Sequence, residues 1–197
     1  MKEVFDTREY LEKMWEIAER IKVPKDVGTH FKGAMIYSAL NICDAMQLLI
    51  QKQNFVPTVI LLRSLFEYIF RVYWLNRVAS AAEVNKVIHE GKWPDTKTLH
   101  SSISELPYID KLVIKKQEMN DILCSYVHGG SQAALSMMGN GTIQPNIPDS
   151  DVSSLLCDIQ LSSYMLLSEL ESLSGENNFQ AEIDKITEEL LVAKQPI

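Results

Sequence analysis

Residues 57–75 of the chain read PTVILLRSLFEYIFRVYWL, and this stretch decides the fold. Its apolar residues occupy almost the whole circumference of a helix, which is the pattern of a helix packed at the centre of a protein. Pro57 suits the first position of such a helix, because its missing N–H is not needed there. We therefore predict a central helix that begins at Pro57 and ends near Ala79.

Three charged residues form a single stripe along this apolar helix. Arg63, Glu67 and Arg71 lie at i, i+4 and i+8, so each successive pair is within reach of a salt bridge. One interpretation is an exposed ladder of ion pairs. The other is a half-buried stripe in which both arginines share Glu67 and leave a net positive charge for an anion such as phosphate. A buried Arg–Glu–Arg triad can also be purely structural.

Helical periodicity continues on both sides of this helix, and no run of alternating strand residues occurs. The expected helices are one that begins with a capping box of Asp6 and Glu9 and closes at Pro24, a long one capped by Thr29, and others at about 81–89, 109–127, 149–173 and from 177 or 178 onward. Residues 92–108 are expected to be a surface connection with one helical turn, and 131–138 one or two further turns. The sequence GNGTIQPNIP, residues 139–148, is the longest loop signal.

This pattern predicts an all-α fold, an antiparallel helical bundle with long central helices and an additional C-terminal helix. A chain of 197 residues corresponds to one domain. We expect a single domain over 1–197, made of a bundle over 1–176 and a terminal amphipathic helix over 177–197.

The composition is that of a soluble globular protein, with 46% hydrophobic and 23% charged residues. The odd number of cysteines, three, argues against a disulfide framework or a zinc site and fits a reducing compartment. The N-terminal residues lack the apolar run of a secretory signal, and no apolar stretch is long enough to span a membrane. We therefore expect a cytoplasmic protein without a membrane partner.

The net charge of −7 disfavours indiscriminate binding to nucleic acid, but it hides a split. Residues 1–116 carry a balance of +3, and residues 117–197 a balance of −10. An anionic ligand would meet the protein most favourably in the basic stretch from Lys52 to Lys116.

A second constellation is NDILCSYVHGGSQ, residues 120–132, in which His128 ends a helix just before two glycines. A histidine there can cap the helix and interact with its dipole, or it can act as a general acid or base. Cys124 is expected to be an inert, buried thiol. Ser125 with His128 shows no sign of an oxyanion hole, and the four histidines are too dispersed for a metal site. No cofactor-binding fingerprint occurs either, so neither metal nor cofactor is expected.

The pattern Leu62-Arg63-Ser64-Leu65-Phe66-Glu67 with Arg71 and Trp74, and the later Ser125-Tyr126-Val127-His128-Gly129-Gly130-Ser131-Gln132, resembles a group of uncharacterised bacterial helical proteins related to the HEPN-like superfamily. The resemblance covers about residues 30–135. It implies a bundle of four to five helices, commonly dimeric, and a setting in phage defence, toxin–antitoxin or stress systems.

HEPN ribonucleases place an arginine and a histidine on one helix and cleave RNA without metal. The helix before His128 has no arginine, so an equivalent site in this chain would be composite, with Arg63 or Arg71 approaching His128. By this resemblance His128 would shuttle the 2′-hydroxyl proton, an arginine would stabilise phosphorane charge, and Glu67 would orient the arginine.

Two hypotheses follow. The first is a non-catalytic helical module of a bacterial defence or stress system that binds a partner protein, such as an antitoxin, or a small anion. The second is a metal-independent HEPN-like endoribonuclease or toxin that acts as a dimer. Whether the protein is an enzyme stays open at this point. A homodimer is expected under either hypothesis, while RNA binding is not indicated by the net charge.

Overall fold

The computed structural model describes residues 2–106, 109–139, 141–175 and 178–193. Within these ranges it contains ten helices and one two-stranded hairpin, which confirms the predicted all-α class. The elements are α1 (Lys2–Arg20), α2 (Val27–Gln51), α3 (Phe55–Arg77), α4 (Ala81–Glu90), α5 (Thr96–Ile103), α6 (Ile109–Glu118), α7 (Asn120–Val127), α8 (Ser131–Leu135), β1 (Met138–Gly139), β2 (Thr142–Ile143), α9 (Asp149–Ser174) and α10 (Gln180–Ala193).

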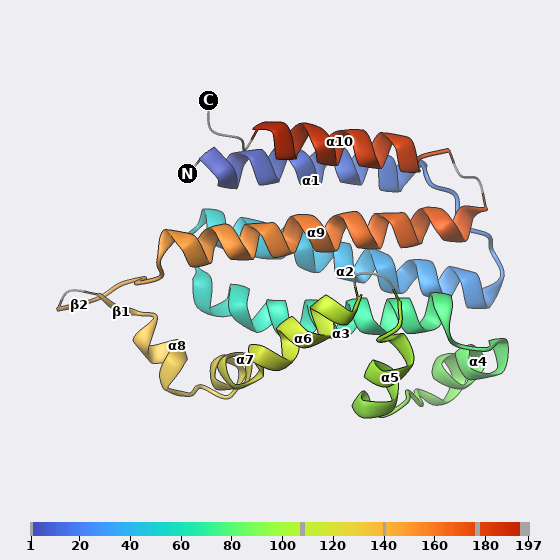
Figure 1. Ribbon diagram of the computed structural model, residues 1–197, viewed down its shortest axis with the longest axis horizontal. Coiled ribbons are helices and arrows are strands. Elements are labelled where there is room, and N and C mark those ends of the chain that lie inside the picture. Colours follow the sequence, from blue (N-terminus) through green and yellow to red (C-terminus); the bar gives the residue numbers. More distant parts are fainter. Residues whose placement is uncertain (1, 107–108, 140, 176–177, 194–197) are drawn as a thin grey trace.

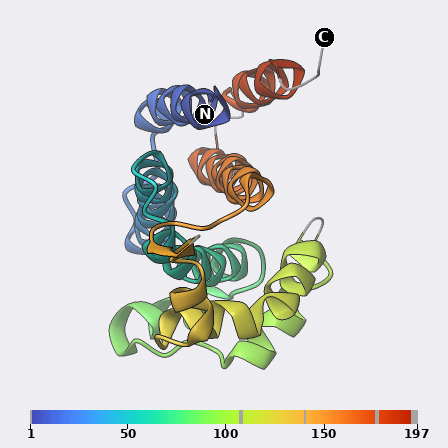
Figure 2. The ribbon, with the colours of Figure 1, turned by 90° about the vertical axis from the view of Figure 1, so that its left-hand side faces the viewer.

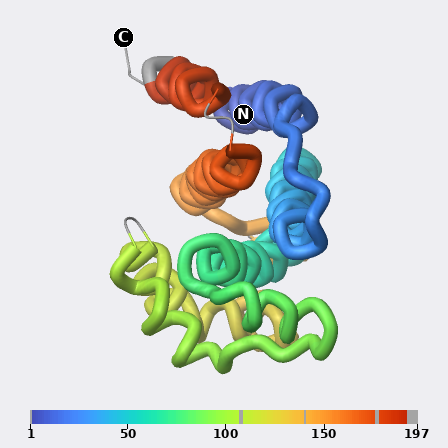
Figure 3. The backbone as a smooth tube through the Cα atoms, turned by 90° about the vertical axis from the view of Figure 1, so that its right-hand side faces the viewer, coloured from blue at the N-terminus to red at the C-terminus, as the bar shows by residue number. Residues whose placement is uncertain are grey.

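The long helices form an inner bundle of α1, α2, α3, α9 and α10 (Figure 1). α2 runs antiparallel to α1 and α3, and α9 packs antiparallel against α2, while α10 lies along α1 and also contacts α9. The short helices α4 to α8 lie on the side of α3 that faces away from α1 and α10 (Figure 2). The hairpin projects beyond the start of α3, between α8 and α9 (Figure 1), and we call these short helices together with the hairpin the cover. The view from the opposite end shows the same order of layers (Figure 3).

The core lies between the long helices, because their apolar faces meet there. Phe66, Leu65, Ile69 and Phe70 of α3 are fully buried, and the rings of Phe66 and Phe70 stack with centroids 6.4 Å apart. α3 therefore occupies the central position predicted from its sequence.

The first three helices begin at residues other than those predicted from the sequence. α1 begins at Lys2, so Asp6 and Glu9 lie inside the helix and form no cap. α2 begins at Val27, because the carboxylate of Asp26 accepts the Thr29 N–H at 2.9 Å and takes the capping role expected of Thr29. α3 begins at Phe55, two residues before Pro57.

The segment between α3 and α9 contains more secondary structure than the sequence indicates. Asp95 caps α5 by accepting the Thr98 N–H, which makes two turns of helix where we expected one. The predicted helix over 109–127 is divided at Met119 into α6 and α7, at a position without glycine or proline. Part of the expected loop at 139–148 pairs as the hairpin, with Met138 opposite Ile143.

The start of the C-terminal helix is fixed by a buried carboxylate. Glu171 of α9 is 4% exposed, and one of its oxygens accepts the backbone N–H groups of Phe179 and Gln180, each at 2.7 Å. This places the start of α10 at Gln180. Asn177, one of the two starts that the sequence suggests, lies outside the described residues.

One helix of the inner bundle, α2, is long and apolar enough to cross a membrane by length and composition. The core helices of soluble proteins meet the same criteria, and α2 packs against α1, α3 and α9.

Candidate functional site

The charged stripe of α3 is half-buried and faces the cover, and each of its residues contacts a different part of it. The Nη1 of Arg63 donates to the Sγ of Cys124 in α7 at 3.4 Å. The Oε1 of Glu67 lies 3.4 Å from the Nζ of Lys116 in α6. The guanidinium carbon of Arg71 lies 4.9 Å from the ring centre of Trp93, between α4 and α5. The stripe thus ties α3 to three successive parts of the cover.

The arginines do not share Glu67, in contrast to the second interpretation of the stripe. Glu67 pairs with Lys116, whose side chain is 11% exposed and so depends on this carboxylate for its charge partner. Neither Arg63 nor Arg71 forms an ion pair with any described residue. Their neutral partners, a thiol and an indole ring, leave two positive charges along this side of α3.

A histidine that the sequence analysis did not single out lies beside this stripe. The ring of His100 in α5 meets the edge of the Phe70 ring, with centroids 4.8 Å apart. Burial lowers the pKa of His100, the positive charge of Lys116 lowers it further, and Glu67 acts in the opposite direction. The fold therefore favours the neutral form of His100, and its buried Nε2 has no hydrogen-bond partner among the described residues.

His128, the predicted histidine of the composite site, is exposed at the end of α7. Its backbone N–H donates to the carbonyl of Cys124 at 3.0 Å, which fits a helix cap. Its side chain forms no hydrogen bond or ion pair within the described part of the chain. Arg63 contacts α7 one turn before His128, whereas Arg71 lies two turns further along α3 from Arg63. Arg63 thus reaches the helix that ends at His128, and Arg71 contacts another part of the cover.

The glycines after His128 direct the chain into α8. Gly129 has a φ of +67°, which a residue with a side chain rarely adopts. The Gly130 N–H donates to the Ser125 carbonyl at 2.6 Å, and a Cβ on Gly130 would overlap the Ser125 hydroxyl. That hydroxyl accepts the Gln132 N–H at 3.2 Å. Ser125 therefore holds the turn between α7 and α8 and is not presented as a nucleophile.

Cys43, Cys124 and Cys157 are all free thiols that differ in burial, and Cys157 is exposed. Burial raises the pKa of Cys43 to about 12, so this thiol is inert. Cys124 is half-buried, where we expected a buried thiol, and is the residue that Arg63 contacts. No group of three His, Cys, Asp or Glu side chains that could hold a metal ion occurs among the residues described.

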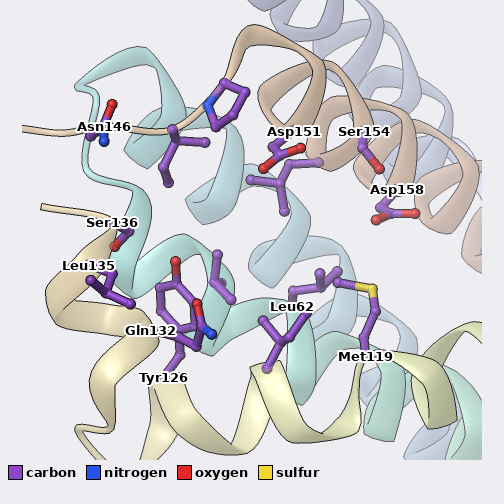
Figure 4. A pocket seen from close by; sticks show the side chains of 15 residues that line it. Leu62, Met119, Tyr126, Gln132, Leu135, Ser136, Asn146, Asp151, Ser154 and Asp158 are labelled. Atoms are coloured by element: carbon purple, nitrogen blue, oxygen red, sulfur yellow. The ribbon is translucent and has the colours of Figure 1, made fainter. Parts of the chain in front are cut away.

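The cover and α9 enclose a pocket of about 420 Å³, within the range typical of small-molecule sites. We call it the α9 pocket. Its walls come from α3, the junction of α6 and α7, α8, and the first three turns of α9 with the residues before them. Figure 4 shows Leu62, Met119 and Tyr126 opposite the polar side chains of α9.

The polar wall of the α9 pocket is one face of α9. Asp151, Ser154 and Asp158 lie at i, i+3 and i+7, and all three line the pocket (Figure 4). Asp158 is 5% exposed and forms an ion pair with Lys115 of α6, which does not itself line the pocket. Burial raises the pKa of Asp158, and the charge of Lys115 only partly offsets this effect.

A long uncharged stretch of the chain contributes to the lining of this pocket and exposes several apolar side chains. The stretch from Ile122 to Pro148 contains no Asp, Glu, Lys or Arg. It carries five of the twelve large hydrophobic side chains that are exposed among the described residues: Ile122 (45%), Val127 (38%), Leu135 (52%), Met138 (62%) and Ile143 (89%). We call these five side chains the uncharged face; Ile122 and Leu135 also line the α9 pocket.

The sequence analysis identified the α3 stripe but missed the α9 pocket. A signal was present, because Asp151, Ser154 and Asp158 share one face of a helix that is otherwise rich in leucine. The charge-free stretch after Asp121 was a second signal, since a folded protein rarely leaves so long a surface segment uncharged.

Comparison with known proteins finds one family. A family model described as "Family of unknown function (DUF6988)" matches residues 36–192, which span the inner bundle from α2 onward and the whole cover. No curated protein and no solved structure matches the chain.

Proposed function

The chain belongs to this family of unknown function, DUF6988, and we propose from its geometry that it is a non-catalytic helical module that binds a partner protein on the uncharged face. The concentration of exposed apolar side chains in one charge-free stretch carries the proposal. The cores of protein interfaces are depleted of charged residues, and large exposed apolar patches mark interaction sites.

The positions of the charged residues around this face support a partner protein over a small anion. The α9 pocket, which Ile122 and Leu135 of this face help to line, contains two carboxylates and no lysine or arginine among its described lining residues, so it repels an anion. The unpaired arginines Arg63 and Arg71 lie half-buried between α3 and the cover, where they hold the layers together. A setting in bacterial defence or stress remains part of the proposal and rests on the resemblance of the two sequence motifs.

A photo-crosslinking amino acid placed at Leu135 of the full chain, in its own cells, tests this function. Val27 is the matched control, since it is exposed to 65% and lies at the start of α2, away from the uncharged face. We expect one discrete adduct with another protein from position 135 and none from position 27. Equal adducts at both positions, or none at either, would overturn the proposal. An adduct with the mass of two chains would show that the partner is a second copy of this chain, and it would overturn the proposal of a different partner protein.

One observation favours a second candidate, the metal-independent ribonuclease. Arg63 contacts α7 one turn before His128, whose side chain has no partner in the described residues. Purified protein incubated with mixed RNA in the presence of a chelator tests it. If the site is catalytic, His128→Ala abolishes cleavage while stability changes by less than about 1 kcal/mol, as is usual for an exposed residue. Absence of cleavage by the wild-type protein would exclude this candidate.

A further inference from the structure

The α9 pocket has two chemically distinct walls. Apolar side chains from α3, the α6–α7 junction and α8 form one wall, among them Leu62, Met119 and Leu135. Asp151, Ser154 and Asp158 of α9 form the other wall (Figure 4). Gln132, Ser136 and Asn146 add uncharged polar groups, so the two aspartates are the only acidic side chains among the described residues of the lining. A ligand with an apolar part and a group that satisfies carboxylates fits this arrangement.

The charge of the polar wall decides which group this is. Asp158 uses Oδ1 for Lys115, and Oδ2 has no hydrogen bond to any described residue. A carboxylate offers about four lone-pair sites, so Asp158 can accept another donor. Asp151 is exposed at the pocket mouth and forms no ion pair within the described ranges. Two carboxylates against one lysine leave the wall with a net negative charge.

The depth of the two acids indicates how such a ligand lies. Asp158 is 5% exposed at the inner end, and Asp151 lies two helical turns away toward the solvent, a rise of about 10 Å. Ser154 lies between them, within one turn of each, and adds a hydroxyl acceptor. A cation attracted by Asp151 at the mouth can thus pass to Ser154 and Asp158 while its stem lies against the apolar wall.

We propose that the α9 pocket binds a primary ammonium group on an apolar stem, as presented by a lysine side chain of the partner. This inference rests on the proposed function, because it names the chemistry that the partner places in the pocket that Ile122 and Leu135 of the uncharged face help to line. The ammonium donates to Asp158 and Ser154, and the stem packs against Met119 and Leu135. Hydrogen bonds between ionised groups in such a half-enclosed site are shorter and stronger than neutral ones.

Three probes of equal length and different charge test the inference on the purified full chain: n-hexylammonium, 1-hexanol and hexanoate. The methyl resonance of Met119, which lines the pocket, reports binding at the site. We expect hexylammonium to shift this resonance and to bind at least about tenfold more tightly than hexanol, with no shift from hexanoate. Equal binding of hexylammonium and hexanol, or no shift of Met119 by hexylammonium, would overturn the inference.

Two variants and a matched control test which carboxylates of α9 bind the ammonium group. Asp158→Asn is expected to reduce the preference for hexylammonium most strongly, but it also removes the partner of Lys115. Asp151→Asn breaks no ion pair and is expected to weaken hexylammonium binding without changing the melting temperature. Asp149→Asn, at the first position of α9 and outside the pocket lining, should leave binding unchanged. An Asp151→Asn variant that binds like the wild type would contradict the proposed path.

The outcomes separate this inference from the proposed function. Selective binding of hexylammonium without an adduct at position 135 would support the cation-binding pocket and contradict the proposal that the chain binds a partner protein. A specific adduct at position 135 without selectivity among the probes would support binding of a partner protein and contradict the proposal that a lysine side chain of this partner enters the pocket.

Discussion

The inner bundle and the cover are both helical, yet they are held together differently. The inner bundle buries long apolar faces, with Leu62, Phe66 and Leu166 among its fully buried side chains. In the cover, α4, α5 and α6 each bury at least two apolar side chains, whereas α7 buries only Leu123 among the residues described and α8 buries none. The contacts between α3 and the cover include an ion pair, a thiol contact and a cation–π contact. Under the proposed function, α7, α8 and the hairpin present the binding surface, and the buried apolar faces of the bundle hold it in place.

The largest expected loss in the free energy of unfolding comes from a substitution that opens a cavity in the bundle. Phe66→Ala removes a side chain that is 0% exposed, and such truncations cost about 3–5 kcal/mol. Leu135→Ala in the cover should stay within about 0.5 kcal/mol, because that side chain is 52% exposed. Urea unfolding of both variants measures the two costs. Similar losses would show that the cover and the bundle contribute equally to stability.

The next largest loss of stability is expected from breaking the ion pair between Glu67 of α3 and Lys116 of α6. Glu67→Gln leaves the Lys116 ammonium almost buried without a charge partner, and we expect a loss of about 1–3 kcal/mol. Adding Lys116→Met removes the stranded charge and should restore most of this loss. Urea unfolding of the single and double variants gives the coupling between the two residues. If the double variant is less stable than Glu67→Gln alone, the pair is not the link between α3 and α6.

The smallest expected effect is a dependence of the protein's stability on pH, caused by His100. Because the fold lowers the pKa of His100, the unfolded chain takes up its proton at a higher pH than the folded protein. Its contribution to stability is therefore present above the ordinary histidine pKa of about 6.5 and is lost as the pH falls through the lowered value. Melting temperatures from pH 8 to 5 should fall less in His100→Asn than in the wild type. Parallel curves would contradict a neutral His100.

The long apolar segments made much of the fold predictable. The central helix and α9 follow from unbroken helical periodicity, and their observed ends lie within about two residues of the predicted ones. The ends of α1 and α2 were less predictable, since Asp6, Asp26 and Thr29 are all competent caps and only the packed structure selects among them. The break at Met119 has no local signal in the sequence.

The site was less predictable because its partners come from distant elements. The spacing of Arg63, Glu67 and Arg71 on α3 identified a charged stripe, but the periodicity of one helix does not show that Glu67 meets Lys116 or that Arg71 covers Trp93. The α9 pocket needs four segments to come together, so it exists only in the folded chain. The uncharged stretch, in contrast, was visible in the sequence, and its exposure came from the structure.

The most direct test of the binding surface is the yield of the photo-crosslinked adduct from position 135 when two other residues of the uncharged face are charged. Met138→Glu with Ile143→Glu places carboxylates on the hairpin, where both side chains are exposed and paired across the strands. If the uncharged face is one interface, the yield falls at least about tenfold, while Val78→Glu on the exposed end of α3 leaves it unchanged. An unchanged yield in the hairpin variant would contradict the claim that α7, α8 and the hairpin form one binding surface.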